Sequence, residues 1–228
     1  LIFLASAEEE KSGKNGIKSV IPKLPKIDFA IIGEPTKMEI AIAEKGLIVF
    51  DLIIEGTPSH AAHPNTNNPI QKISKIIDQI NALSFDKVSK TLGKVKVTIT
   101  QVNAGNQHNV VPSDVKMVVD VRVNDLYSNQ DILKIFKDNV DCKILARNLD
   151  LNSKSIDSNH QINSIAKKLK INTYGSPTLS DQSKIKCDSV KIGPGDSKRS
   201  HTSNEFVFLD EIKKAIPRYI KILEMLKI

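Results

Sequence analysis

Three short polar segments carry the residues best suited to chemistry, and each directly follows an apolar stretch. Residues 8–10 (Glu-Glu-Glu) follow residues 1–5, residues 33–36 (Gly-Glu-Pro-Thr) follow residues 29–32, and residues 193–196 (Gly-Pro-Gly-Asp) follow residues 190–192. His201 comes shortly after the third segment. Carboxylates and an imidazole are suitable ligands for zinc and similar divalent metals. The pattern therefore favours a metal site, in which adjacent glutamates supply a ligand and a proton shuttle.

Each segment has a plainer interpretation when it is taken alone. A run of three glutamates is commonly an exposed acidic turn, Gly-Glu-Pro-Thr is typical of a loop that starts a helix, and a lone His201 is typical of a surface histidine. The metal interpretation gains weight because ligands of open α/β sheets bind beyond the carboxyl ends of the strands. Three such ends in one sheet are expected to meet at one pocket.

The elements that must position these segments form two groups. Short apolar strands at 1–5, 27–32 and 190–192, with helices at 159–169 and 209–226, predict an α/β domain with a mostly parallel sheet. Strands at 46–55, 94–103, 114–124 and 141–146, with helices at 68–83 and 130–140, give the order β-α-β-β-α-β of a ferredoxin-like unit. We therefore expect an α/β domain of residues 1–43 and 149–228, interrupted by an α+β domain of residues 44–148.

Composition excludes several classes of protein. The chain has 228 residues, of which 40% are hydrophobic and 26% charged, as expected for a globular protein with a core. The net charge is +7, but the lysines are spread along the chain, aromatic residues make up 4% and tryptophan is absent. We therefore expect no nucleic-acid partner, and no apolar run is long enough to predict a membrane partner. Two isolated cysteines favour a cytoplasmic location.

Six short motifs, in order along nearly the whole chain, resemble the M20 family of metallopeptidases and deacylases. They are residues 5–10 (ASAEEE), 33–36 (GEPT), 56–64 (GTPSHAAHP), 109–112 (NVVP), 120–122 (DVR) and 193–205 (GPGDSKRSHTSNE). The resemblance implies a two-zinc α/β catalytic domain with a ferredoxin-like lid that also forms a homodimer. Co²⁺ or Mn²⁺ are alternative metals.

The resemblance also implies a role for each matching residue. Glu9 resembles the general base and His60 the lid histidine that stabilises the oxyanion in the partner subunit's site. Glu8 and Glu9 are the alternative to Glu9 and Glu10 as the working pair of glutamates, and His63 is the alternative to His60 as the lid histidine. The remaining matches resemble the metal ligands Glu10, Glu34 and His201 and the substrate contacts Asn109, Arg122, Gly193 and Gly195.

Plainer interpretations remain for two of these residues. A strand arginine such as Arg122 is commonly an exposed cross-strand partner, and Asn109 is able to cap a turn before Pro112. The family also carries a His-x-Asp motif and a bridging Asp ahead of the paired glutamates, which this chain does not contain. The chain starts at Leu1 inside an apolar run, so we expect a fragment that alone binds metal poorly and is inactive.

The activity implied by the resemblance is zinc-dependent hydrolysis of an amide bond. The preferred substrate is a small N-acyl amino acid, as for acetylornithine deacetylase in arginine biosynthesis. An M20 dipeptidase or aminoacylase is the alternative within the enzyme class. A non-catalytic dimerising or binding relative is the alternative outside that class.

Overall fold

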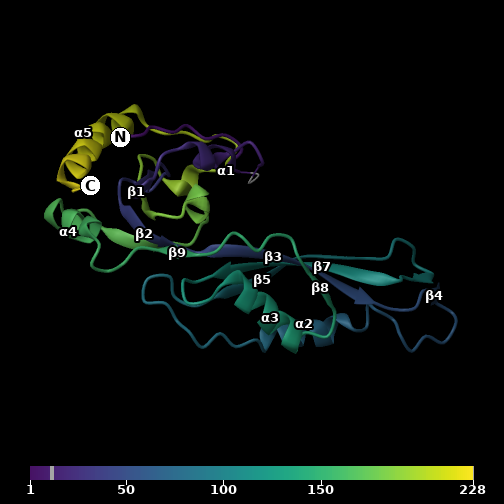
Figure 1. Ribbon diagram of the computed structural model, residues 1–228. Coiled ribbons are helices and arrows are strands. Elements are labelled where there is room, and N and C mark those ends of the chain that lie inside the picture. Colours follow the sequence, from purple (N-terminus) through teal and green to yellow (C-terminus); the bar gives the residue numbers. More distant parts are fainter. Residues whose placement is uncertain (11–12, 228) are drawn as a thin grey trace. The chain divides into compact units, whose positions relative to one another are not determined.

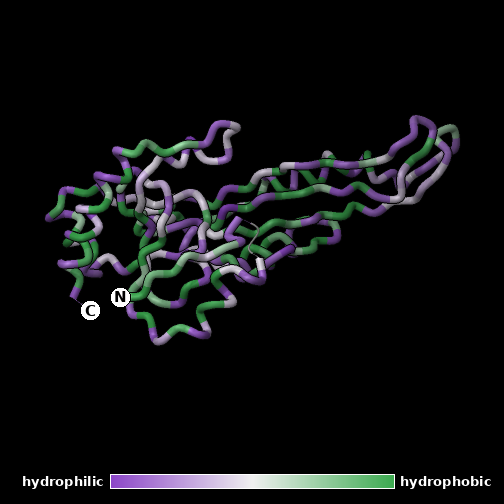
Figure 2. The backbone as a smooth tube through the Cα atoms, turned by 90° about the horizontal axis from the view of Figure 1, so that it is seen from above, coloured by the Kyte–Doolittle hydropathy of each residue, from purple (hydrophilic) through white to green (hydrophobic). Residues whose placement is uncertain are grey.

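The computed structural model describes residues 1–10 and 13–227. The chain divides into two compact units, residues 1–45 with 154–228, and residues 46–153. After the roles that the resemblance implies, the first is called the catalytic unit and the second the lid unit (Figure 1). A helix long and apolar enough to cross a membrane is absent from the described residues. Figure 2 shows why: hydrophobic stretches along the backbone are short and are interrupted by hydrophilic residues.

The lid unit is built on a four-stranded antiparallel sheet with the order β5-β7-β3-β8. This order, with its two helices, confirms the ferredoxin-like unit. A two-stranded antiparallel ribbon is formed by β4 and β6. The elements are β3 (Gly46–Glu55), β4 (Ser59–His60), α2 (Ile73–Asn81), β5 (Lys96–Ala104), β6 (Val110–Val111), β7 (Asp114–Val123), α3 (Asn129–Asn139) and β8 (Lys143–Ala146).

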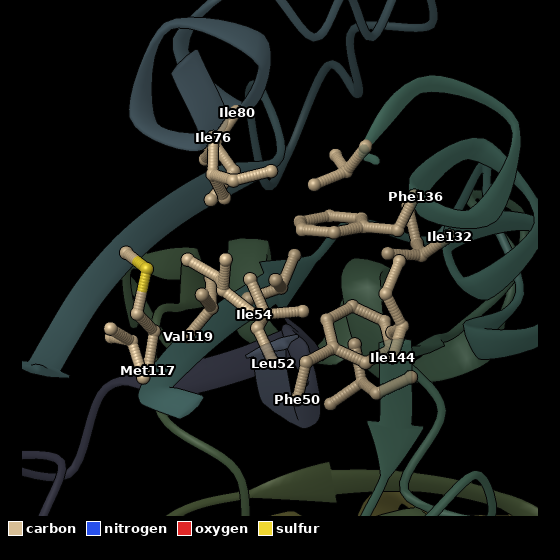
Figure 3. Packing of buried hydrophobic residues seen from close by; sticks show 14 of the residues in the cluster. Phe50, Leu52, Ile54, Ile76, Ile80, Met117, Val119, Ile132, Phe136 and Ile144 are labelled. Atoms are coloured by element: carbon tan, nitrogen blue, oxygen red, sulfur yellow. The ribbon is translucent and has the colours of Figure 1, made fainter. Parts of the chain in front are cut away.

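Alternation of apolar residues places the core of the lid unit between the sheet and its two helices. Every second residue of β3 and β7 is buried, including Phe50 and Met117 at 0% exposure. Figure 3 shows these side chains meeting Ile76 of α2 and Phe136 of α3. The rings of Phe50 and Phe136 have centroids 4.5 Å apart. Burial of this continuous face stabilises the sheet and fixes its register.

Helix α2 is shorter than the residues 68–83 expected from its isoleucine spacing. Pro69 disfavours helical backbone at the residue before it. The Asn68 side chain accepts a hydrogen bond from the Ile70 backbone N–H at 2.9 Å, which holds a turn instead. Helix α3 begins close to its predicted start because Ser128 and Asp131 form a reciprocal capping box.

The catalytic unit contains a mixed sheet with the order β1-β11-β2-β10, and β9 pairs with β2. The β1/β11 and β10/β2 pairs are parallel, while β11/β2 and β2/β9 are antiparallel. The strands are β1 (Phe29–Ile32), β2 (Ile40–Glu44), β9 (Lys154–Ser155), β10 (Thr173–Ser176) and β11 (Asp188–Lys191). The helices are α1 (Ile17–Val20), η1 (Ile21–Lys23), α4 (Gln161–Lys168), η2 (Asp181–Lys184), η3 (Ser197–Arg199) and α5 (Leu209–Met225).

Helices α4 and α5 contribute to the core of the catalytic unit, together with strands β2 and β11. Ile162 and Ile165 of α4 and Ala215 and Ile222 of α5 are all buried in it. The strand expected at residues 1–5 is a wrong prediction, because these residues have no strand structure and the Leu1 side chain is fully exposed. A strand needs a neighbouring strand for its backbone hydrogen bonds, and none of the described strands pairs with this segment.

Candidate functional site

Two of the three polar segments lie side by side, because β1 and β11 are parallel neighbours that end together. The backbone N–H of Thr36 donates to the carbonyl oxygen of Gly193 at 3.2 Å. The backbone N–H of Gly193 donates in return to the hydroxyl of Thr36 at 3.1 Å. A Cβ at Gly193 would lie 2.5 Å from the carbonyl oxygen of Glu34. Only glycine fits this approach, which fixes the backbone at Glu34.

The second glycine of this loop is required for a different reason. Gly195 has a φ of +90°, a conformation that side chains rarely allow. Its carbonyl oxygen accepts a hydrogen bond from the backbone N–H of Lys37 at 2.7 Å. The Lys37 ammonium pairs with Asp196 at 2.8 Å. Gly193 and Gly195 thus join the two loops to each other, and their contact with substrate stays a prediction.

Glu34 and Glu9 occupy a common electrostatic environment. The pKa of Glu34 is raised to about 7: burial is the main cause, the nearby carboxylates of Glu9, Glu44 and Asp181 contribute, and Lys191 acts in the opposite direction. Burial likewise raises the pKa of Glu9, with Asp181 and Glu10 as further causes. Because Glu9 is among the carboxylates that raise the pKa of Glu34, and both respond to Asp181 and Lys191, the structure brings together two of the residues that the sequence singles out.

The side chains of Glu10 and His201 approach each other at the surface of the same unit. The Nε2 atom of His201 lies 3.8 Å from Oε2 of Glu10, and the two side chains are 75% and 73% exposed. The backbone N–H of His201 donates to the carboxylate of Glu205 at 3.1 Å. His201 has a φ of 59°, which is unusual for a residue with a side chain. Such local backbone strain is frequent at functional sites.

Glu8 makes contacts that differ from those of its two neighbours. Its carboxylate accepts hydrogen bonds from the backbone and the side-chain nitrogen of Asn15, at 3.1 and 3.0 Å. Its φ is 57°, so the chain turns sharply here. A carboxylate that holds a turn in this way is less available for metal or water. This geometry favours Glu9/Glu10 over Glu8/Glu9 as the working pair, and the assignment stays a prediction.

The donor types around Glu9 and Glu34 fit a divalent cation, but their geometry provides only part of a site. Five carboxylates face only two lysines, so the cluster has an excess of negative charge that a cation would balance. Among the described residues, no group of three His, Cys, Asp or Glu side chains is placed to hold a metal. The acidic members are Glu9, Glu10, Glu34, Glu44 and Asp181, and the lysines are Lys184 and Lys191.

Sequence reasoning missed the buried charged residues of this cluster. Glu44, Asp181 and Lys191 are exposed by 0%, 4% and 1%. A signal was present, because Lys191 interrupts the apolar stretch 190–192 and Glu44 ends the apolar stretch 40–43. Charged residues are rarely fully buried unless they are paired. One charged residue in each of two short apolar stretches thus indicates a buried ion pair.

The lid unit brings His60 and Asn109 together on the ribbon of β4 and β6. The Nδ1 atom of His60 accepts a hydrogen bond from the backbone N–H of Ala62 at 3.1 Å. The carbonyl oxygen of Asn109 accepts one from Ala61 at 2.9 Å. The rings of His60 and His63 have centroids 5.7 Å apart. His60 is exposed, so its Nε2 is accessible as the histidine role requires, although that role stays a prediction.

Arg122 lies on the sheet face opposite the two helices of the lid unit. Its guanidinium forms a bidentate pair with Asp120, with nitrogen–oxygen distances of 2.8 and 3.1 Å. The Arg122 side chain is 32% exposed. The plainer interpretation of a strand arginine with an ionic partner therefore describes its observed contacts, and the predicted contact with substrate stays a prediction.

Comparisons with known proteins agree with the motif order. Residues 42–148 match the model of the M20 peptidase dimerisation domain. The chain is 29% identical to a succinyl-diaminopimelate desuccinylase of Wolbachia pipientis, over 95% of this chain and 60% of the relative. It is 27% identical to a [LysW]-lysine/[LysW]-ornithine hydrolase of Saccharolobus solfataricus, over 99% of this chain and 66% of the relative. The chain thus spans about two thirds or less of the length of these relatives.

Solved structures share the fold. A tripeptidase of Staphylococcus aureus superimposes with a TM-score of 0.75 at 20% identity, over 96% of this chain and 62% of that chain. A dinuclear metal-binding peptidase of the M20 family from Bacillus subtilis gives 0.63 at 17% identity, over 97% and 64%. Together, the matched domain, the sequence relatives and the shared fold identify residues 42–148 as an M20 peptidase dimerisation domain and show that the chain as a whole is similar to M20 peptidases.

Proposed function

We propose that the intact protein is a metal-dependent hydrolase that cleaves the amide bond of a small acylated amino acid. The observation that carries this proposal is the carboxylate cluster of the catalytic unit, where Glu9 and Glu34 share one environment beside Glu10 and His201. An excess of partly buried negative charge, such as that at Glu9 and Glu34, is costly without a cation. The matched M20 dimerisation domain and the fold shared with a dinuclear metal-binding peptidase support the same interpretation.

The proposal assigns Glu10, Glu34 and His201 as ligands of two zinc ions, with Co²⁺ or Mn²⁺ as substitutes. When bound, the metal would polarise the scissile carbonyl and lower the pKa of a water molecule. Glu10 and His201 are suited to share one ion, because their side chains already lie 3.8 Å apart. Glu34 is suited to the other, and a cation beside it would lower the pKa that burial raises to about 7.

Glu9 is the proposed general base. Burial and neighbouring carboxylates raise its pKa, which brings it closer to the value at which a carboxylate accepts and returns a proton near neutral pH. Glu9 would take a proton from the attacking water and pass it to the leaving amine. His60 of the partner subunit's lid would donate a hydrogen bond to the developing oxyanion. A homodimer formed through the lid unit is therefore part of the proposal, supported by the matched dimerisation domain.

The proposed substrate class is an N-acylated diamino acid. The relatives are named for diaminopimelate, lysine and ornithine, each of which has two amino groups. N-acetylornithine, the substrate expected from the motifs, belongs to the same class. A peptidase is the second candidate, supported by the fold shared with a tripeptidase. We place the activity in amino-acid biosynthesis in the cytoplasm, in line with two free cysteines.

The test combines metal binding with a substrate panel, using the intact protein. Calorimetry with ZnCl₂ and CoCl₂ is expected to show binding that Glu34→Gln weakens. Among N-succinyl-diaminopimelate, N-acetylornithine, dipeptides and tripeptides, we expect turnover of an acylated diamino acid. Preferential turnover of peptides would favour the second candidate, and binding without turnover of any member would favour a non-catalytic relative.

Matched variants separate the proposed roles. Glu9→Gln is expected to lower kcat by at least about 100-fold, while Glu8→Gln retains most activity, because general acid–base catalysis contributes about 10²–10⁴-fold. His60→Ala is expected to lower kcat with little change in zinc content, whereas His63→Ala has a smaller effect. Full activity of His60→Ala would refute the oxyanion role.

A further inference from the structure

The carboxylate cluster contains a buried ion pair. The Nζ atom of Lys191 is 3.2 Å from Oε2 of Glu44, and the two side chains are 2% and 0% exposed. Lys191 is the last residue of β11 and Glu44 is the last residue of β2, and these two strands are antiparallel neighbours. Removing two charges from water costs more than their attraction returns unless further hydrogen bonds satisfy them. Their other contacts therefore indicate what the pair does.

Three of these contacts go to the last residue of β10 and to the loop that follows it. The Lys191 ammonium donates to the hydroxyl of Ser176 at 2.8 Å and to the carbonyl oxygen of Thr178 at 2.9 Å. The Ser180 hydroxyl donates to Oε2 of Glu44 at 2.8 Å. The ion pair thus fixes the loop at its beginning and at its end. The loop leads directly into the short helix η2, whose first residue is Asp181.

Asp181 connects this fixed loop to the segment that carries the paired glutamates. Its Oδ2 accepts a hydrogen bond from the hydroxyl of Ser6 at 2.8 Å, across 175 positions of sequence. Its Oδ1 accepts one from the ammonium of Lys184 at 3.0 Å. Ser6 lies three residues before Glu9, in a segment without strand or helix structure. The segment therefore depends on side-chain contacts for its placement.

We propose that Asp181 is a positioning residue of the carboxylate cluster. It holds the segment of Glu9 and Glu10 through the Ser6 hydroxyl, and the Lys191–Glu44 pair holds Asp181 in place. The role of Asp181 in catalysis rests on the proposed function, whereas its hydrogen bond to Ser6 is a contact observed in this chain whatever the function. A hydrogen bond from a neutral hydroxyl to a buried carboxylate contributes enough that its loss should raise local opening about tenfold.

The test is limited digestion of the intact protein with a protease that cleaves after glutamate, with sites resolved by mass spectrometry. Asp181→Ala is expected to raise cleavage after Glu8, Glu9 and Glu10 about tenfold, because cleavage follows the population of the opened segment. Cleavage after Glu205 of the same unit is the internal reference and should not change. Asp188→Ala, an exposed aspartate of that unit, is the matched control and should behave like the unchanged protein.

Two milder variants keep the test independent of folding. Asp181→Asn retains an oxygen that accepts from Ser6, so its cleavage after residues 8–10 should stay near the original rate. Ser6→Ala removes the hydroxyl but leaves the Asp181–Lys184 contact, so its cleavage should rise about tenfold. The substitution itself is able to change how well the protease cleaves the open segment. Each cleavage rate of Ser6→Ala is therefore divided by the rate for a synthetic peptide of residues 1–13 that carries the same substitution.

Three results would overturn the proposal. The first is an unchanged rate of cleavage after residues 8–10 in both Ser6→Ala and Asp181→Ala. The others are a rise in cleavage after Glu205 as large as that after residues 8–10, or the same rise after residues 8–10 in the control Asp188→Ala. Failure of the proposed function would be seen separately. The intact protein would then bind no ZnCl₂ in calorimetry, whatever the cleavage pattern, and a rise confined to residues 8–10 would still establish the anchor.

Discussion

Replacing Gly193 by alanine is expected to destabilise the catalytic unit by about 1–3 kcal/mol, the usual cost of overpacking. The added Cβ would lie 2.5 Å from the carbonyl oxygen of Glu34 and 3.2 Å from its carbonyl carbon and its nitrogen. Ordinary contact starts at 3.4 Å, so the oxygen is roughly 0.9 Å too close. All three contacting atoms are backbone, which leaves no flexible side chain to move aside.

Relief of this clash must also disturb hydrogen bonds between the two loops. The carbonyl oxygen of Gly193 accepts from Thr36 at 3.2 Å and from Met38 at 2.9 Å. Moving Gly193 away from Glu34 lengthens these bonds, each of which contributes about 1 kcal/mol. The expected loss of unfolding free energy in Gly193→Ala thus lies in the upper part of the range of about 1–3 kcal/mol, unless the loop moves as a whole.

Gly33→Ala is the matched control, because a Cβ there would meet no atom within 4 Å. It should change stability by less than about 1 kcal/mol, in the stabilising direction, since alanine restricts the unfolded chain. Hydrogen exchange measured against urea concentration resolves the two units and gives the free energy of opening at β1 and β11. Equal stability of the two variants would refute the steric argument.

Three further outcomes are expected. Phe136→Ala should destabilise the lid unit by about 3–5 kcal/mol in urea unfolding, because the ring of Phe136 is fully buried against Phe50. Leu145→Ala is the control: its side chain is 46% exposed, so the substitution should cost less than about 1 kcal/mol. Burial raises the pKa of Cys142 to about 11, so iodoacetamide should alkylate it at least about tenfold more slowly at pH 8 than in the unfolded chain. The hydrogen bond from Arg147 lowers the pKa of Asp51, so this pair stabilises the fold at pH values above the ordinary aspartate pKa and loses its effect as the pH falls. In unfolding measurements, Asp51→Asn should therefore lower the free energy of unfolding by at most about 1 kcal/mol at pH 7 and should have no effect at pH 2.

The order and type of the long elements could be predicted from the amino-acid sequence. Alternation in 46–55 and 114–123 identifies β3 and β7, because one buried face of a sheet imposes a period of two. The motif order also predicted the family, which the comparisons confirm. Short strands were missed: β2 and β10 have only five and four residues, which are too few for a periodic signal.

The sequence predicted those residues of the candidate site that lie in recognisable motifs. Glu34 and Gly193 follow apolar strands, and the parallel pairing of β1 with β11 makes their loops adjacent. The strand expected at residues 1–5 did not form, because a strand depends on a neighbour that a local pattern cannot reveal. For the same reason, the sequence could not say that Ser6 would contact Asp181.

The sequence by itself determined which segments carry chemistry, since apolar stretches and the polar residues that end them are local properties of the chain. Only the tertiary structure decided how these residues act on one another. The raised pKa of Glu34 depends on burial and on carboxylates from three other segments, and the Lys191–Glu44 pair joins positions 147 residues apart. Electrostatic interactions depend on distance in space and on exclusion of water, which only the folded chain defines.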